Sequence, residues 1–231
     1  MKIKRIIGAT IEEIKDKKFN IWIGISLGNR YFTKSRIKAY ILWALGYTKK
    51  DIVIVIADSL HIVNFEILKN YSKEIARERA EKVGKDIKNS VQRIVYSLSK
   101  EDQKRLRILN WKEATNFKTY KEAERIVFNL FKNDSEFRKR ILQVVRKQLG
   151  KHAPEDNKKI ERLAEYVLKE LPILILGVEN KGKLYNLIPY PGLTELDILV
   201  EEINSKNIFP EIIENIEPKQ KRVIVEAYAD T

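Results

Sequence analysis

The chain contains no cysteine, which excludes disulfide bonds and thiolate metal sites. It has only two histidines, His61 and His152, so a serine-hydrolase triad would have to use one of them. Glycine and proline are scarce, with 9 and 6 residues among 231. No Gly/Ser-rich linker, internal repeat or low-complexity run divides the sequence. We therefore expect a single domain over residues 1–231.

Long apolar runs are also missing. No segment approaches the roughly 18 consecutive apolar residues needed to cross a bilayer. Residues 1–20 carry charges within short apolar runs, unlike a signal peptide. We expect a soluble, cytoplasmic protein without a membrane partner, and a monomer, although the sequence does not determine the oligomeric state.

Acidic residues are too few to balance the basic ones. The chain has 45 Lys and Arg against 32 Asp and Glu, a formal net charge of +13. Such an excess favours a polyanion as partner, either nucleic acid or an anionic membrane. Charge alone does not identify which.

Two continuous apolar runs indicate strands buried on both faces. They are NIWIGISL (residues 20–27) and DIVIVIAD (51–58), and SRIKAYILWALGY (35–47) between them has the pattern of an amphipathic helix. A strand, a helix and a second strand within about forty residues form a βαβ unit, which requires parallel strands.

The remaining pattern extends this unit into an α/β fold. We expect helices at about 66–99, 101–110, 119–132, 135–150 and 156–171, and a buried strand in PILILGV from Pro172. TELDILVEEIN (194–204) predicts a helix and KRVIVEAYA (221–229) a late strand. The predicted fold is a single Rossmann-like domain with a mostly parallel central sheet flanked by helices. Ligands of such sheets bind beyond the carboxyl ends of the strands, where Ser26 and Asp58 fall.

GISLGNRYF (24–32) contains G-x-S-x-G, the pattern of a nucleophile elbow, with Ser26 at its centre. The same pattern is also common in ordinary strand-to-helix turns. A hydrolase would need a histidine after an acid along the chain, and His61 comes early for that order, while His152 lies in the charged segment KHAPED. No oxyanion motif such as HGGG precedes the serine, and neither GxxxxGK[ST] nor GxGxxG occurs.

GISLGNRYF before a helix, VIVIAD before a long basic helix, then EYVLKELP, ILGV and a Tyr-Pro pair together resemble the cyclodipeptide synthases. The resemblance covers about residues 20–195. It implies a Rossmann-type domain similar to the catalytic domain of tyrosyl- and tryptophanyl-tRNA synthetases. It also implies two successive aminoacyl-tRNA substrates, a diketopiperazine product, and neither cofactor, metal nor ATP. No HIGH-like or KMSKS-like signature is present.

The resemblance implies a role for Ser26. The serine would take the first aminoacyl group as a covalent ester in a ping-pong scheme. An aminoacyl-tRNA ester is already activated, and the vicinal ribose hydroxyl can relay a proton, so a catalytic histidine is not required. Gly24 would leave room for the bound side chain. We assign Gly24, Asn29 and Asp58 to substrate binding.

Tyr166 and Glu170 in EYVLKE are four residues apart and share one face of a helix, at the edge of its apolar stripe. This position suits either the lip of a pocket or an ordinary core edge. The resemblance implies that both hold the ammonium group of the aminoacyl moiety. A carboxylate there could bind the cation and later accept its proton.

A second catalytic tyrosine is implied by the family and has two candidates. Tyr190, which precedes Pro191, fits the expected spacing and context, and Tyr185 competes with it. Asn29 matches one subfamily and Tyr190-Pro191 the other, so the subfamily and the two amino acids joined stay open.

Two basic helices could contact the tRNA acceptor stem. The family's long helix contributes Arg79, Lys82, Lys85, Lys88 and Arg93 here, and these residues share their side with several acids. The segment 137–151 contributes Lys139, Arg140, Arg146 and Lys147 without any acid, so we expect it to be the stronger source of the positive field. Contacts of this kind supply affinity rather than base readout. The main hypothesis is a cyclodipeptide synthase; the alternatives are a non-catalytic RNA-binding protein and a G-x-S-x-G hydrolase.

Overall fold

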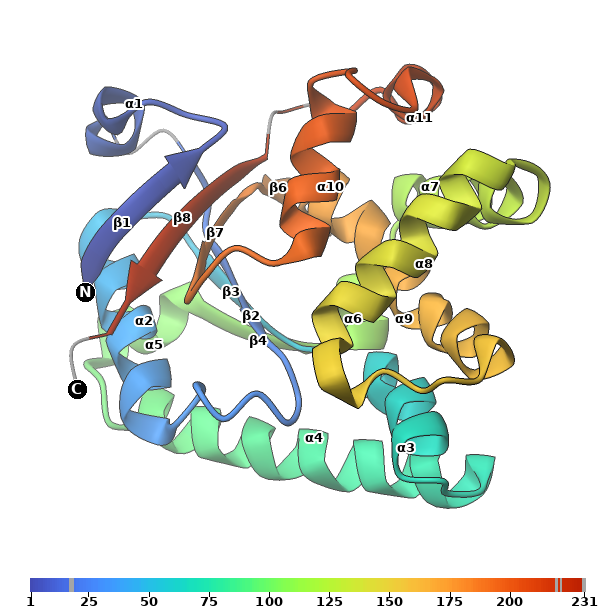
Figure 1. The fold of residues 1–231 in the computed structure, drawn as a ribbon. Coiled ribbons are helices and arrows are strands. Elements are labelled where there is room, and N and C mark those ends of the chain that lie inside the picture. Colours follow the sequence, from blue (N-terminus) through green and yellow to red (C-terminus); the bar gives the residue numbers. More distant parts are fainter. Residues whose placement is uncertain (17–18, 219, 221, 230–231) are drawn as a thin grey trace.

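A mostly parallel sheet forms the centre of the molecule (Figure 1). The computed structural model describes residues 1–16, 19–218, 220 and 222–229. Its parallel half has the order β2-β3-β4, formed by Trp22–Ile25, Ile52–Ile56 and Leu106–Asn110. The predicted βαβ unit is confirmed, with α2 (Lys34–Tyr47) between the first two strands.

The second half of the sheet is built from the late part of the chain and the N-terminal strand. β7 (Leu187–Tyr190) pairs in parallel with β8 (Val223–Tyr228), and β1 (Lys2–Ile7) adds to β8 in antiparallel orientation. A parallel bridge between Ile21 and Leu187 joins the two halves beside β2. The predicted late strand is therefore confirmed in its described part; Lys221, its first predicted residue, lies outside the described residues.

Helices cover both faces of the sheet (Figure 1). Besides α2, the helices and short turns are α1 (Ile11–Lys15), η1 (Ser59–His61), α3 (Ile62–Leu68), α4 (Lys73–Tyr96), α5 (Lys100–Arg105), α6 (Trp111–Ala114), α7 (Lys118–Asn133), α8 (Ser135–Leu149), η2 (Gly150–His152), α9 (Asn157–Leu176), α10 (Glu195–Asn204) and α11 (Pro210–Ile216). A small hairpin of β5 (Val178–Asn180) and β6 (Lys183–Tyr185) follows α9. No helix in the described part of the chain is long and apolar enough to span a membrane.

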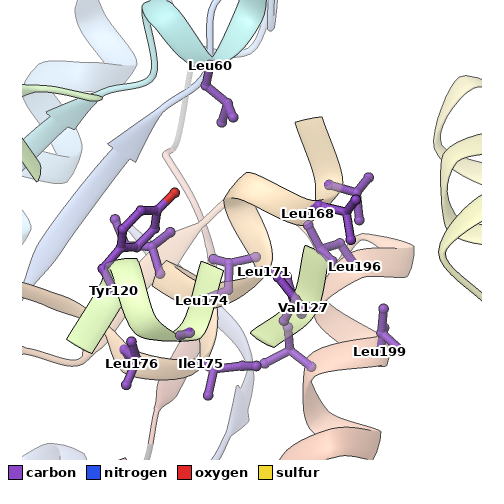
Figure 2. Close-up of a cluster of buried hydrophobic side chains, with 14 of the residues drawn as sticks. Leu60, Tyr120, Val127, Leu168, Leu171, Leu174, Ile175, Leu176, Leu196 and Leu199 are labelled. Atoms are coloured by element: carbon purple, nitrogen blue, oxygen red, sulfur yellow. The ribbon is translucent and has the colours of Figure 1, made fainter. Parts of the chain in front are cut away.

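Two hydrophobic cores lie on opposite faces of the sheet. One packs α2 and α4 against the sheet through residues such as Tyr40 and Val91. The other gathers α6 to α10, and Figure 2 shows part of it, with Val127 of α7, Leu171 of α9 and Leu199 of α10 in one cluster. Of the helices over the second face, α8, α9 and α10 lie near the carboxyl ends of β2 and β3.

Three predicted elements were wrong in type or extent. The helix expected at 101–110 ends at Arg105, and residues 106–110 form β4, because pairing with β3 outweighs local preference. The strand expected from Pro172 is the end of α9, which continues to Leu176 and stops at Gly177. A short apolar run does not distinguish a buried strand from a buried helix. The helix expected at 66–99 is interrupted at residues 69–72, between α3 and α4.

Helix α4 approaches the end of β3 at Gly84, where a Cβ atom would lie 2.5 Å from the Cβ of Asp58. We expect Gly84→Ala to lower the free energy of unfolding by about 1 to 3 kcal/mol, because the helix must shift away. Gly46→Ala on α2 is the control, since a Cβ there meets no described atom within 4 Å. We expect that substitution to raise stability by about 0.5 kcal/mol through helix propensity. Urea unfolding measures the change in the free energy of unfolding of both variants. Equal changes would show that the close approach of α4 to Asp58 does not determine the effect of Gly84→Ala.

Candidate active site

A cavity of about 300 Å³ lies at the carboxyl ends of β2 and β3, beneath α8, α9 and α10. Its lining residues include Trp22, Gly24, Ser26, Val55, Ala57, His61, Asn64, Trp111, Val145, Leu163, Tyr166, Glu170, Ile188, Tyr190 and Asp197. The walls are mostly apolar, and a few polar side chains converge on them, which is the usual character of a small-molecule site.

Ser26 is the first residue after β2, and its hydroxyl lies in the cavity. Its Oγ is 3.0 Å from Nε2 of His61, which comes from the 3₁₀ turn η1 just after β3. The Tyr166 hydroxyl lies 3.4 Å from the same nitrogen. Ser26, His61 and Tyr166 therefore form one hydrogen-bonded cluster. Sequence reasoning missed His61 as a partner of Ser26.

Tyr166 and Glu170 both face the cavity from α9, as expected for positions at the edge of the apolar stripe. Glu170 makes no hydrogen bond or ion pair within the described part of the chain. Burial raises the pKa of its carboxyl from 4.5 to about 8, with the nearby Asp197 charge adding to the rise and Arg222 opposing it. Burial also raises the pKa of Tyr166, and the Glu170 charge adds to that rise.

Asp197 and Arg222 form a buried ion pair beside Glu170, with Arg222 Nη2 donating to Asp197 Oδ1 at 2.5 Å. Asp197 also caps α10, because its Oδ2 accepts from the backbone N–H and the hydroxyl of Thr194. The pair thus fixes the start of α10 at the edge of the cavity. The Asp197 carboxylate also keeps a negative charge near Glu170, which adds to the rise in the pKa of Glu170.

The structure separates the two candidate tyrosines. Tyr190 lines the cavity from the end of β7, whereas Tyr185 is buried in the hairpin strand β6 and is not among the lining residues. Asn29 Nδ2 donates to the Tyr190 hydroxyl at 3.4 Å, and the Phe32 ring packs against the Tyr190 ring. The two residues that match different subfamilies are therefore in contact. The geometry favours Tyr190, and its catalytic role stays a prediction.

The other two predicted substrate-binding residues have different environments. Gly24 lines the cavity, and a Cβ there would lie 3.1 Å from the Trp22 ring and 3.7 Å from Ile188. Asp58 is not among the lining residues, and its Oδ1 accepts from the backbone N–H groups of Ser59 and Trp111 at 2.8 and 3.0 Å. The geometry gives Asp58 a role in capping η1 and α6. Its assignment to substrate binding therefore has no support from the contacts.

The two predicted basic helices differ in whether their basic side chains form ion pairs. On α8, Arg140 pairs with Glu202 at 2.6 Å and Lys147 with Glu195 at 3.1 Å, both on α10. The side chain of Arg146 donates to Asn157. On α4, none of the five predicted contact residues, Arg79, Lys82, Lys85, Lys88 and Arg93, forms an ion pair with another described residue, and all but the half-buried Lys88 are exposed. Figure 1 shows the two helices on different sides of the molecule.

The amino-acid sequence matches that of a known protein family. The cyclodipeptide synthase family profile matches residues 6–193. No curated protein sequence matches the chain.

The fold is similar to three solved structures. A cyclodipeptide synthase from Bacillus thermoamylovorans superimposes with a TM-score of 0.74 at 20% identity, covering 98% of this chain and 96% of that one. A cyclodipeptide synthase from Candidatus Glomeribacter gigasporarum bound to Phe-tRNAPhe gives a TM-score of 0.62 at 15% identity, covering 96% and 94%. A tryptophanyl-tRNA synthetase from Encephalitozoon cuniculi bound to tryptophan gives 0.50 at 15% identity, covering 92% of this chain and 52% of that one.

Proposed function

Because this chain belongs to the cyclodipeptide synthase family, we propose that it joins two aminoacyl groups, each delivered by a tRNA, through an ester on Ser26. The observation that carries this proposal is the convergence of the Ser26 hydroxyl, the unpaired Glu170 carboxyl and two tyrosines on one apolar cavity. A nucleophile and a cation-binding acid within one cavity are the groups that aminoacyl transfer needs.

In the first half-reaction the Ser26 oxygen attacks the ester carbonyl, and the tRNA leaves with its ribose hydroxyl restored. The acylated serine holds the amino-acid side chain among the apolar residues around Gly24, such as Trp22 and Val55. This pocket supplies amino-acid selection, because phosphate contacts elsewhere carry no information about the side chain. The enzyme is then ready for a second aminoacyl-tRNA, which defines a ping-pong scheme.

Glu170 is suited to the amine chemistry of both half-reactions. With its pKa near 8, the carboxyl is largely protonated at neutral pH before a substrate binds. An ammonium group entering the cavity favours the ionised carboxylate, so substrate binding releases a proton to solvent. The carboxylate can later accept a proton from the ammonium group before its nitrogen attacks a carbonyl carbon. Tyr166 and Tyr190 border the same space and help to position the amine.

The tRNA body binds mainly along α4, because the five basic residues predicted there form no ion pair with another described residue. The charges of Arg140 and Lys147 on α8 are already compensated by α10. Lys139 of α8 remains exposed and adds to the positive field. We therefore place Arg79, Lys82, Lys85, Lys88 and Arg93 against tRNA phosphates, with α8 as a weaker contributor.

Salt dependence tests this placement. Each phosphate contact contributes roughly −0.7 to −0.9 to the slope of log affinity against log salt. We expect replacing Lys82 and Lys85 together by Gln to flatten the slope for tRNA by about 1 to 2 units. Replacing Arg140 and Lys147 together by Gln is the matched control and should change it less. A larger change in the control pair would move the tRNA to α8.

The overall function is tested by mass spectrometry of medium from a host that expresses the chain. A new cyclic dipeptide is the expected result, and its mass identifies the amino acids. The Ser26–His61 contact is the observation that favours the hydrolase alternative. A hydrolase would release free amino acid from aminoacyl-tRNA and form no cyclic dipeptide, and an RNA-binding protein would bind tRNA without consuming the ester.

A further inference from the structure

The position of His61 is fixed from several sides. Asp58 is the N-cap residue of η1, and its Oδ1 accepts from two backbone N–H groups, of Ser59 and of Trp111 on α6. On the other side, the Tyr166 ring of α9 packs edge-on against the imidazole, with centroids 5.0 Å apart. His61 is only 9% exposed. The ring therefore has little freedom, and its Nε2 stays directed at Ser26.

Both ring nitrogens of His61 have partners. Nε2 is 3.0 Å from Ser26 Oγ, and Nδ1 is 3.3 Å from Nδ2 of Asn64, one turn further along in α3. A neutral imidazole carries its proton on one nitrogen and accepts at the other, so the group at Nδ1 decides what Nε2 does. If the Asn64 oxygen faces Nδ1, that nitrogen carries the proton and Nε2 is an acceptor. In the structure the Asn64 nitrogen faces Nδ1, an arrangement in which Nε2 is a donor. A half-turn of the amide, whose oxygen and nitrogen have nearly the same shape, brings the oxygen to Nδ1 and makes Nε2 the acceptor.

We propose that His61 Nε2 accepts the proton of the Ser26 hydroxyl as its oxygen attacks the aminoacyl ester, and that Asn64, with its amide oxygen turned to Nδ1, selects the tautomer that allows this. The inference rests on the proposed function, since it concerns the same acylation of Ser26. The Oγ–carbon bond forms, the bond from that carbon to the ribose oxygen breaks, and Nε2 returns its proton to the ribose oxygen. His61 is therefore a catalytic residue and Asn64 a positioning residue.

The protonation state of His61 is compatible with this role. Burial lowers the pKa of the imidazole from 6.5 to about 4, so the ring is neutral and can accept a proton throughout the neutral range. A base of this strength is weak, and the activated ester substrate requires no stronger one. The competing route passes the serine proton to the vicinal ribose hydroxyl and does not involve His61.

The experiment measures single-turnover formation of labelled Ser26 ester, using total tRNA charged with a mixture of labelled amino acids. His61→Gln places an amide near Ser26 that can hydrogen-bond but cannot take a proton, and His61→Ala removes both functions. We expect each to slow acylation by about 100-fold, the lower end of the range for general-base catalysis. Added imidazole should restore much of the rate of His61→Ala and leave His61→Gln unchanged.

Asn64 provides a second, independent readout. Asn64→Asp offers Nδ1 only acceptor oxygens and should acylate at least as fast as the wild type. Asn64→Leu should slow acylation by roughly tenfold, the value of about one net hydrogen bond. Wild-type rates in His61→Gln, or no imidazole rescue of His61→Ala, would overturn the inference and leave the proposed function standing. Failure of the wild type to form any Ser26 ester would instead refute the proposed function.

Discussion

Ser26→Ala is expected to abolish the covalent aminoacyl label completely while tRNA binding stays intact. The reason is positional, because Ser26 Oγ is the hydroxyl at the carboxyl end of β2, and the basic side chains of α4 are not part of the cavity. The measurement is acid-stable label on the protein after incubation with aminoacyl-tRNA labelled on the amino acid. Filter binding of the same tRNA reports affinity separately.

Two further variants sharpen the Ser26 result. Ser26→Cys should keep a label, now as a thioester that neutral hydroxylamine removes rapidly. Ser59→Ala is the matched control, because Ser59 begins η1 and does not line the cavity. A label that persists in Ser26→Ala would show that another residue is the nucleophile. Cyclic dipeptide formed by Ser26→Ala without any labelled protein would rule out the ping-pong route.

The parts of the fold that followed from the sequence are those in which local pattern and tertiary structure agree. The runs 20–27 and 51–58 are buried on both faces, so their continuous apolar character indicates parallel strands directly. β4 could not be predicted in this way, because LRILN becomes a strand only through its register beside β3. The end of α9 is apolar on all sides, and no period there separates helix from strand.

Part of the candidate site could be predicted from the rule that ligands bind at the carboxyl ends of parallel strands. The carboxyl ends of β2 and β3 meet at one edge, which brings Ser26 close to the turn after Asp58. The same rule could have identified His61, three residues beyond Asp58. The chain order of hydrolase triads does not predict it, because His61 comes too soon after Ser26 for that order. The ion pairs that compensate Arg140 and Lys147 could not be predicted, because the sequence does not show that α10 packs against α8.

Glu170→Gln should raise stability at alkaline pH while it suppresses the reaction. The folded-state pKa of Glu170 is raised above its ordinary value, from 4.5 to about 8. Between these values the folded protein retains a proton that the unfolded chain has released, so the stability that this group contributes is full below pH 4.5 and is lost as pH rises towards 8. A shift of this size corresponds to a loss on the order of 4 kcal/mol. Glutamine resembles the protonated acid at every pH and removes this loss.

The free energies of unfolding of wild type and Glu170→Gln are therefore expected to be similar near pH 4.5 and to diverge in favour of the variant up to about pH 9. Urea unfolding across this range measures the divergence. Glu165→Gln is the control, a substitution of the same chemistry on the same helix, where Glu165 pairs with Arg162 and Lys169. An equal gain in that control would attribute the effect to net charge rather than to the cavity.

Cyclic dipeptide formation by Glu170→Gln should fall by about 100-fold or more, because glutamine can neither bind the ammonium group as an anion nor accept its proton. A variant that is more stable at pH 9 and still fully active would show that Glu170 has no part in the chemistry.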